Sequence, residues 1–222
     1  MDTVRAAFRD ECVRLEGVLR GLDAADLDRP TPCPPWTVRD LLAHVRTGAG
    51  RLVGMLAAPA PERAEVDAAG YFGAAKFAPD VDRDRIDGAR REARELPGVP
   101  EVAEGFARAW RAADAAVAAE PPGRVVRTRH GDAMALTEFL RTRVVEVGVH
   151  GLDLADALDR RPWLTPTAAT VVAGLLADGA PPDGLGWDAL TLVRKATGRV
   201  PVTDAERAVL DRTGFRWLSF GG

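Results

Sequence analysis

Apolar residues recur at intervals of three and four along most of the chain, which is the spacing of helices that bury one face. The first such segment runs from about Thr3 to Arg20. A second follows Thr37, which forms a helix-capping pattern with Asp40 three residues later. A third covers roughly residues 100–119. Thr137 is expected to cap a fourth, which extends to about Leu158. The predicted core faces comprise Val4, Phe8, Cys12, Leu15, Val18 and Leu19; Val38, Leu41, Leu42, Val45, Leu52 and Leu56; Val102, Phe106, Trp110, Ala113 and Val117; and Leu140, Val144, Val147, Leu154 and Leu158.

Four amphipathic helices with one long middle connection predict an all-α fold, a four-helix bundle with a crossover. The connection, residues 57–98, contains the segment YFGAAKF and the charged run DVDRDRIDGARREARELPG. The charged run is expected to be a solvated helix or a loop with helical tendency. Residues 124–130 are interpreted as a short extended piece.

The segment RRPWLTP, at residues 160–166, suggests a boundary. The predicted organisation is therefore a helical bundle over residues 1–160 and a small helical C-terminal extension over residues 161–222. Within the extension we expect short helices at about 168–177 and 187–198. A last helix is opened by the capping box that begins at Thr203.

Composition and charge exclude several classes of function. The chain has 222 residues, of which 46% are apolar and 28% charged, as is typical of globular proteins. A net charge of −3 provides no basic surface for nucleic acid. No apolar run approaches the roughly 20 residues of a membrane span, and the N-terminal segment is amphipathic, unlike a signal peptide. We expect a cytoplasmic monomer or homodimer that binds neither nucleic acid nor membrane.

The two cysteines, Cys12 and Cys33, do not form a CxxC pair, so a disulfide scaffold is not expected. Cys12 falls on the apolar stripe of the first helix. Cys33 is interpreted as a packing residue, because no histidine lies near it in the sequence to activate a thiol nucleophile. Gly-rich phosphate loops, GxSxG elbows and HExxH motifs are absent from the sequence.

Three polar residues stand out in apolar helical surroundings. Glu146 and His150, four apart in VVEVGVHGLDLADAL, share one flank of a helix, and His44 lies in the helical stretch WTVRDLLAHV. Two imidazoles and one carboxylate would make a three-ligand metal site with open positions. A Glu–His pair at this spacing is also common as a solvent-facing ion pair, and a single helix-edge histidine is usually structural. The residues alone leave both interpretations open.

Other polar residues near this trio are candidates for supporting roles. Asp153, three residues after His150, is placed either to accept that histidine's second ring N–H or to lie on the helix surface. Arg143 would bind an anionic group of a thiol or substrate, or pair with Glu146. His130, in RTRHGD, is a reserve metal ligand. Trp36 is interpreted as a hydrophobic staple at the start of the second helix.

The segments PTPCPPWTVRDLLAHVRTGAGRL and RTRVVEVGVHGLDLADAL resemble the DinB-like metalloprotein superfamily, in particular its branch named for mycothiol-dependent maleylpyruvate isomerase. The resemblance covers about residues 1–158. It implies a four-helix bundle that carries a divalent metal, usually zinc, on His44, Glu146 and His150. It also implies an actinobacterial source. The family commonly has glycine where this chain has Pro35, a difference that concerns the loop geometry. The tail containing Gly198 and Arg199 is similar to the variable C-terminal part of such proteins.

The resemblance implies a divalent-metal-dependent transferase or isomerase that uses mycothiol on a small electrophilic substrate. A bound metal would lower the pKa of the thiol and hold its thiolate. Two alternatives remain at this point. One is a non-catalytic metal-binding stress or ligand-binding protein, and the other is a metal hydrolase with a general base beside a metal-bound water. Arg143, Asp153 and His130 are the extra polar candidates that the sequence offers for either.

Overall fold

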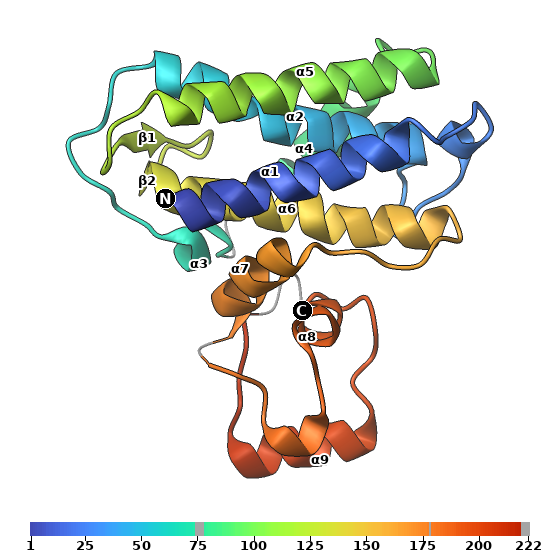
Figure 1. Ribbon diagram of the computed structural model, residues 1–222, viewed down its shortest axis with the longest axis vertical. Helices are drawn as coiled ribbons and strands as arrows, with labels where there is room; N and C mark the ends of the chain where they lie inside the picture. Colours follow the sequence, from blue (N-terminus) through green and yellow to red (C-terminus); the bar gives the residue numbers. More distant parts are fainter. Residues whose placement is uncertain (74–77, 178, 219–222) are drawn as a thin grey trace.

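Four long helices lie side by side in the upper part of the molecule (Figure 1). The computed structural model describes residues 1–73, 78–177 and 179–218. The bundle helices are α1 (Asp2–Leu19), α2 (Val38–Ala57), α5 (Val99–Ala118) and α6 (Leu136–Ala157). The predicted all-α bundle is therefore confirmed.

The helix caps predicted from the sequence can be compared with the structure at the starts of α2 and α6. At α2 the Thr37 side chain accepts a hydrogen bond from the backbone of Asp40, and Asp40 accepts one from the backbone of Thr37 in return. The prediction that Thr137 caps α6 is wrong. The helix begins one residue earlier, at Leu136, and Ala135 at its cap provides no side-chain acceptor. Strand β2 runs directly into the helix there, and this leaves no room for a separate capping turn.

The long connection between α2 and α5 contains two helices, α3 (Ala68–Tyr71) and α4 (Pro79–Ala93). The charged run thus forms a helix, and it packs against α2. Small residues make this contact, since Ala89 and Ala93 are buried while most of the charged side chains face outward. Residues 74–77 of the YFGAAKF segment lie outside the described residues.

A short antiparallel hairpin precedes α6. It pairs β1 (Val125–Arg127) with β2 (Ala133–Ala135), and Val126 is opposite Met134. The expected extended piece therefore exists, with a partner strand that the sequence did not indicate. The backbone N–H groups of residues 65 and 66 donate to the carbonyl of Ala133, which ties the hairpin to the chain before α3.

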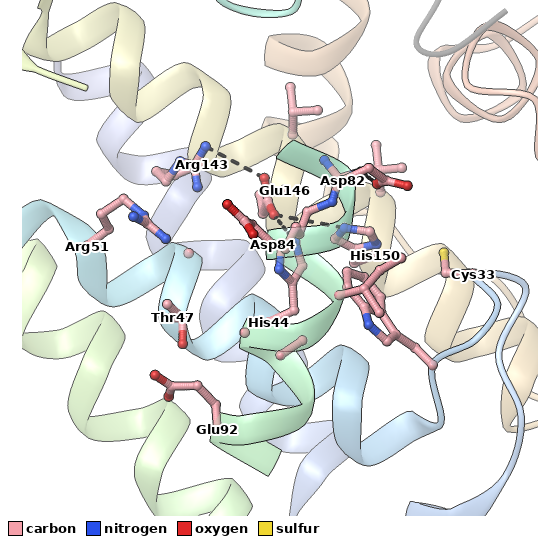
Figure 2. A pocket seen from close by; sticks show the side chains of 18 of the residues that line it. Cys33, His44, Thr47, Arg51, Asp82, Asp84, Glu92, Arg143, Glu146 and His150 are labelled. Atoms are coloured by element: carbon pink, nitrogen blue, oxygen red, sulfur yellow. Dashed lines mark hydrogen bonds and ion pairs between the residues drawn. The ribbon is translucent and has the colours of Figure 1, made fainter. Parts of the chain in front are cut away.

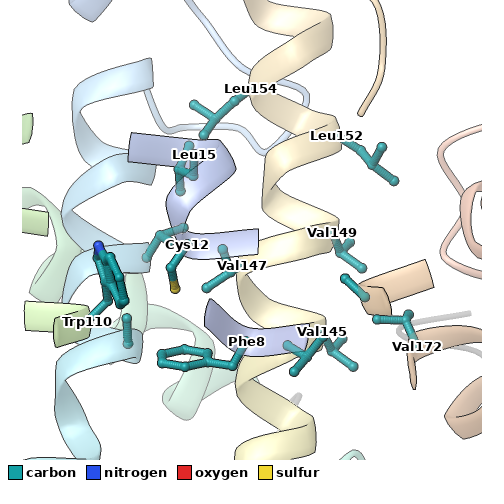
Figure 3. Close-up of a cluster of buried hydrophobic side chains, with 14 of the residues drawn as sticks. Phe8, Cys12, Leu15, Trp110, Val145, Val147, Val149, Leu152, Leu154 and Val172 are labelled. Carbon is teal, nitrogen blue, oxygen red and sulfur yellow. The ribbon is translucent and has the colours of Figure 1, made fainter. Parts of the chain in front are cut away.

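The hydrophobic core lies between α1, α2, α5 and α6, and Figure 3 shows the part of it around α1 and α6. Phe8, Cys12 and Leu15 extend from α1 and meet Val147 and Leu154 of α6, with Trp110 of α5 beside them. Helix α6 is buried around nearly its whole circumference, as expected for a helix at the centre of a bundle. Its few polar side chains are therefore enclosed by other helices.

The C-terminal segment covers one side of the bundle (Figure 1). Helix α7 contacts α1 and α6, while α8 contacts α7 and α6. The predicted capping box at Thr203 is present at the start of α9. The elements are α7 (Pro166–Leu176), the 3-10 helix η3 (Asp183–Leu185), α8 (Ala189–Ala196) and α9 (Asp204–Thr213); a further 3-10 helix, η1 (Asp26–Asp28), precedes α2. Among the described residues no helix combines the length and apolar character that crossing a membrane requires.

Candidate metal centre and its cavity

Three potential metal ligands meet between α2 and α6 (Figure 2). His44 lies in the second turn of α2, and Glu146 and His150 occupy successive turns of α6. Nε2 of His44 is 2.5 Å from Oε1 of Glu146, and Nε2 of His150 is 3.9 Å from the same oxygen. One ligand atom from each residue lies within 4.8 Å of the others. The fold thus brings together the trio that the sequence singled out.

Burial places the His44 imidazole in the state that a metal requires. The His44 side chain is only 16% exposed. Burial lowers its pKa below the ordinary value, although the Glu146 carboxylate opposes this shift in part. A neutral imidazole offers a nitrogen lone pair to a cation. Gly48 allows this close packing, because a Cβ there would lie 3.2 Å from a guanidinium nitrogen of Arg143 and 3.4 Å from Cγ of Glu146.

Asp153 orients the second histidine from behind. Its Oδ2 lies 2.9 Å from Nδ1 of His150, so Nε2 of the ring is directed toward Glu146. Arg199 donates to both oxygens of the same carboxylate, at 3.0 and 2.8 Å. Burial by itself would raise the pKa of Asp153, but the hydrogen bonds from His150 and Arg199 hold it below the ordinary value. The carboxylate is therefore charged and fixed.

Sequence reasoning did not select Arg199 as a site residue. It follows α8, and 46 positions separate it from the aspartate that it binds. The Gly-Arg pair in the C-terminal part was the only signal for it.

Cys33 lies in the site, which corrects its interpretation as a packing residue alone. Its thiol lines the cavity, and its sulfur is 3.2 Å from Oδ2 of Asp153. Burial and the neighbouring carboxylate raise the pKa of this thiol to about 12. Cys33, His150 and Asp153 also cluster at metal-ligand distances. Arg199 already occupies both oxygens of that carboxylate, so the trio with His44 and Glu146 is the better donor set.

Trp36 forms a wall of the site, beyond the staple role expected from the sequence. Its ring lies against the ring of His44, with centroids 4.8 Å apart, and it is almost fully buried. Among the described residues its indole N–H has no hydrogen-bond partner. The indole restricts how the histidine ring can turn.

Beside the trio is a cavity of about 360 Å³, a size that suits a small molecule. Its walls come from α2, α3, α4 and α6, from the loop before α2, from the turn of the hairpin and from the segment after α8, and Figure 2 shows part of this lining. Apolar groups include Tyr71, Phe72, Val145 and Val149; acidic groups from α4 include Asp82, Asp84 and Glu92; basic groups include Arg51, Arg129 and Arg143.

The two remaining predicted residues differ in position. Arg143 is almost fully buried, lines the cavity and has a guanidinium nitrogen 3.6 Å from Oε2 of Glu146. Its guanidinium also packs over the Phe139 ring and donates to the hydroxyl of Thr142. His130, the reserve ligand, lies in the hairpin turn with its ring 5.8 Å from that of Tyr71, and it is not part of the cavity wall.

The fold and the site together define the class of this protein. It is a four-helix bundle with a candidate metal centre, in which two histidines and a glutamate face one cavity. A family model described as the mycothiol maleylpyruvate isomerase N-terminal domain matches residues 8–155. The chain belongs to this family.

Two solved structures share the fold, the mycothiol-dependent maleylpyruvate isomerase and a histidine-to-alanine mutant of that enzyme. Their TM-scores are 0.54 and 0.52, with sequence identities of 16% and 15%. Each comparison covers 78% of this chain and 67% of the other. A search of curated protein sequences gave no match.

Proposed function

We propose that this protein is a divalent-metal-dependent enzyme that uses mycothiol on a small electrophilic substrate, as an S-transferase or an isomerase. The observation that carries the proposal is the convergence of two imidazoles and one carboxylate on the wall of a cavity that can hold a small molecule. Membership of the mycothiol maleylpyruvate isomerase N-terminal domain family supports the choice of thiol.

We propose that His44, Glu146 and His150 hold the metal. Two nitrogens and one oxygen suit zinc, and three protein ligands leave a position for a further ligand. The contact of Asp153 with the second ring nitrogen of His150 supports this assignment, since metal-binding histidines usually carry such a partner. When bound, a zinc ion would lower the pKa of a thiol, so that the thiolate form would be available at neutral pH.

The protein's own thiol in the cavity is unsuited to attack an electrophile. Cys33 has a pKa raised to about 12, so its thiol is protonated near neutral pH and directs its hydrogen toward Asp153. The reactive sulfur therefore comes from a co-substrate on this proposal. The chain's residues orient the imidazoles, exclude water with Trp36 and position the electrophile.

Two outcomes are compatible with thiol addition to a conjugated double bond. Release of the thiol after rotation about the new single bond gives the isomer, whereas retention of the sulfur gives a stable conjugate. S-transfer is the broader of the two, because isomerisation requires a substrate with a particular double bond.

We further propose that residues 1–160 form the metal-binding domain and that residues 161–222 are an extension that completes the site. Support comes from Arg199, which reaches from the extension to Asp153 of α6. On this proposal, loss of the extension loosens His150 without removing a metal ligand.

Mass spectrometry of reaction mixtures tests the function. Zinc-loaded and metal-free protein would each be incubated with mycothiol, glutathione or the alcohol analogue of mycothiol, and with a panel of small electrophiles. We expect conjugates or isomers with mycothiol and the zinc-loaded protein only, and none with Glu146→Ala. A metal-bound protein without thiol-dependent products would favour the non-catalytic alternative. Water-addition products that form without thiol would favour a hydrolase.

A further inference from the structure

Helix α4 forms one wall of the cavity beside the metal trio. Several of its side chains line the cavity, among them Asp82, Ile86 and Glu92. Figure 2 shows this helix beside His44 and Glu146, with Asp82 toward one end of the helix and Glu92 toward the other. The trio is therefore covered on this side by α4.

The attachment of α4 to the rest of the molecule is slight. Within the described part of the chain, it packs extensively against α2 alone. Its buried side chains are those of Ala89 and Ala93, whereas each bundle helix buries several large apolar side chains. Ile86 is only half-buried. Separation of α4 from α2 therefore exposes little apolar surface and should cost less free energy than unfolding of a bundle helix.

One ion pair joins α4 to another element among the described residues. It links Arg46 of α2 with Glu92 of α4. Arg46 lies against Gly105 of α5, where a Cβ would be 3.4 Å from Cδ of the arginine. Glu92 lines the cavity and also an outer groove between α2 and α5, which Arg46 and Gly105 line as well. The pair thus stands between the groove and the cavity, and its rupture would connect the two spaces.

The chain that follows α4 is anchored separately. The guanidinium group of Arg39 donates to the carbonyl oxygens of Leu96 and Pro97, at 2.6 and 2.8 Å. Leu96 is also buried in the core. These contacts involve residues beyond Ala93, the last residue of the helix, so they can persist when α4 separates from α2. The segment after Ala93 is therefore a fixed pivot.

Helix α4 also carries a positive charge close to the trio. Burial lowers the pKa of His44, Glu146 opposes this shift, and the positive charge of Arg85 adds to it. Arg85 is ion-paired with Asp82 of the same helix, so this charge moves with α4. An arriving metal cation is repelled less when α4 is displaced, because like charges repel most strongly at short distance in a partly buried site.

We propose that α4 is a lid that pivots after Ala93 when the Arg46–Glu92 pair breaks, and that its opening is the route by which ions and small ligands reach the trio. The lid does not depend on the proposed function, because it follows from how α4 is attached to α2. An opening that both entry and exit require changes the two rates by the same factor. It leaves the dissociation constant unchanged.

The test variant is Arg46→Gln, which removes the ion pair. Arg46 lies outside the cavity wall, whereas Glu92 forms part of it and is left intact. Arg108→Gln is the matched control. It breaks the Arg108–Glu104 pair within α5, in which both side chains are 72% exposed and neither belongs to α4. Circular dichroism establishes that both variants are folded.

Hydrogen exchange of the metal-free full chain, followed by mass spectrometry, measures the opening directly. We expect α4 peptides to exchange at least about tenfold faster than α5 peptides in the wild type. Arg46→Gln should speed exchange in α4 by about two- to fivefold, the effect of losing a partly exposed ion pair, and leave α5 unchanged. Arg108→Gln should not alter α4. Exchange of α4 at the rate of α5 would overturn the lid, as would equal α4 exchange in Arg46→Gln and wild type.

Stopped-flow measurement of zinc uptake, and of zinc release to a chelator, tests the route. Arg46→Gln should speed both by a similar factor of about two to five, with unchanged zinc affinity. Faster release with weaker affinity would show that Arg46 acts on the metal centre itself and would overturn the proposal, as would unchanged rates. A protein that binds no zinc would remove the proposed function, and the exchange of the metal-free protein would then decide the lid by itself.

Discussion

Helix α6 presents two different surfaces to the rest of the molecule. Toward α1 and α7 it offers valines and leucines that pack against neighbouring side chains, among them Val147, Leu152 and Leu154 (Figure 3). Val145 and Val149 lie at the border, because they are buried and also line the cavity. Toward α2 and the cavity it offers Arg143, Glu146 and His150. The first surface gains stability from excluded water, whereas the second must satisfy each enclosed polar group with a partner.

The comparison teaches how one helix can carry both packing and chemistry. The apolar surface fixes the rotation of α6, and that rotation places residues three and four positions apart in the cavity. The polar surface adds little to the hydrophobic core. Changes on the first surface should therefore alter stability, and changes on the second should alter metal binding.

The largest expected effect falls on the apolar surface. Phe8→Ala should destabilise the fold by about 3–5 kcal/mol, because Phe8 is fully buried against α6 and its removal leaves a cavity. Urea denaturation of the metal-free protein measures the loss. The fraction that stays folded should bind zinc with wild-type affinity. A much weaker zinc affinity in folded Phe8→Ala protein would show that the two surfaces are not separable.

The polar surface should give the reverse result. Replacement of His44, Glu146 or His150 by alanine should remove most of the zinc, as measured by elemental analysis. The free energy of unfolding of each metal-free variant should stay within about 2 kcal/mol of that of the metal-free wild type. His130→Ala is the control, since this histidine lies outside the cavity wall, and it should retain the metal. Loss of zinc in His130→Ala but not in His44→Ala would refute the ligand assignment.

A smaller effect is expected from the partner behind His150. Asp153→Asn should weaken zinc affinity by about 10–100-fold, because the amide orients the histidine less well and leaves Arg199 without its charged partner. Competition with a chelator measures the change. Arg199→Gln should weaken zinc binding less than Asp153→Asn, because the aspartate contact with the ring remains. The opposite ranking would show that Arg199 affects the site by a route other than Asp153.

The sequence could predict the bundle because its signals are local. Three-four spacing marks the buried stripes, and the capping boxes at Thr37 and Thr203 mark two helix starts. The hairpin partner was missed because Ala133–Ala135 reads Ala-Met-Ala and lacks the β-branched residues typical of strands. The cap at Thr137 failed because tertiary pairing extends the strand into the helix start.

The residues of the candidate site also fall into those that the sequence could reveal and those that it could not. His44, Glu146 and His150 could be selected because they interrupt strong apolar patterns on two helices that a bundle places together. The residues that surround these three could not be selected from the sequence. Arg199 comes from a segment beyond α8, and Cys33 comes from a proline-rich loop, so only the folded chain shows that both meet at Asp153.

The smallest expected effect concerns an acid on the apolar side. Glu11 of α1 is fully buried; one of its oxygens accepts the backbone N–H of Thr165, while the other has no partner among the described residues. Burial raises the pKa of this carboxyl above its ordinary value of 4.5. The native state therefore holds the proton more tightly than the unfolded chain does. Wild-type stability should fall as pH rises from 4.5 through the raised native value.

Glu11→Gln should remove that pH dependence and stabilise the fold by about 1 kcal/mol at pH 7, because a neutral amide costs less to bury than a carboxylate. The gain should disappear below about pH 4, where the wild-type carboxyl is protonated.

Glu16→Gln is the matched control one turn later. Burial opposes ionisation of Glu16, but hydrogen bonds from Arg111 and Trp110 hold the pKa of its carboxyl below the ordinary value. Its replacement should therefore destabilise at pH 7, and less so as pH falls below 4.5. Thermal denaturation of both variants between about pH 3 and pH 7 measures these trends, and parallel rather than opposite trends would contradict the assignment of Glu11 as an underpaired acid.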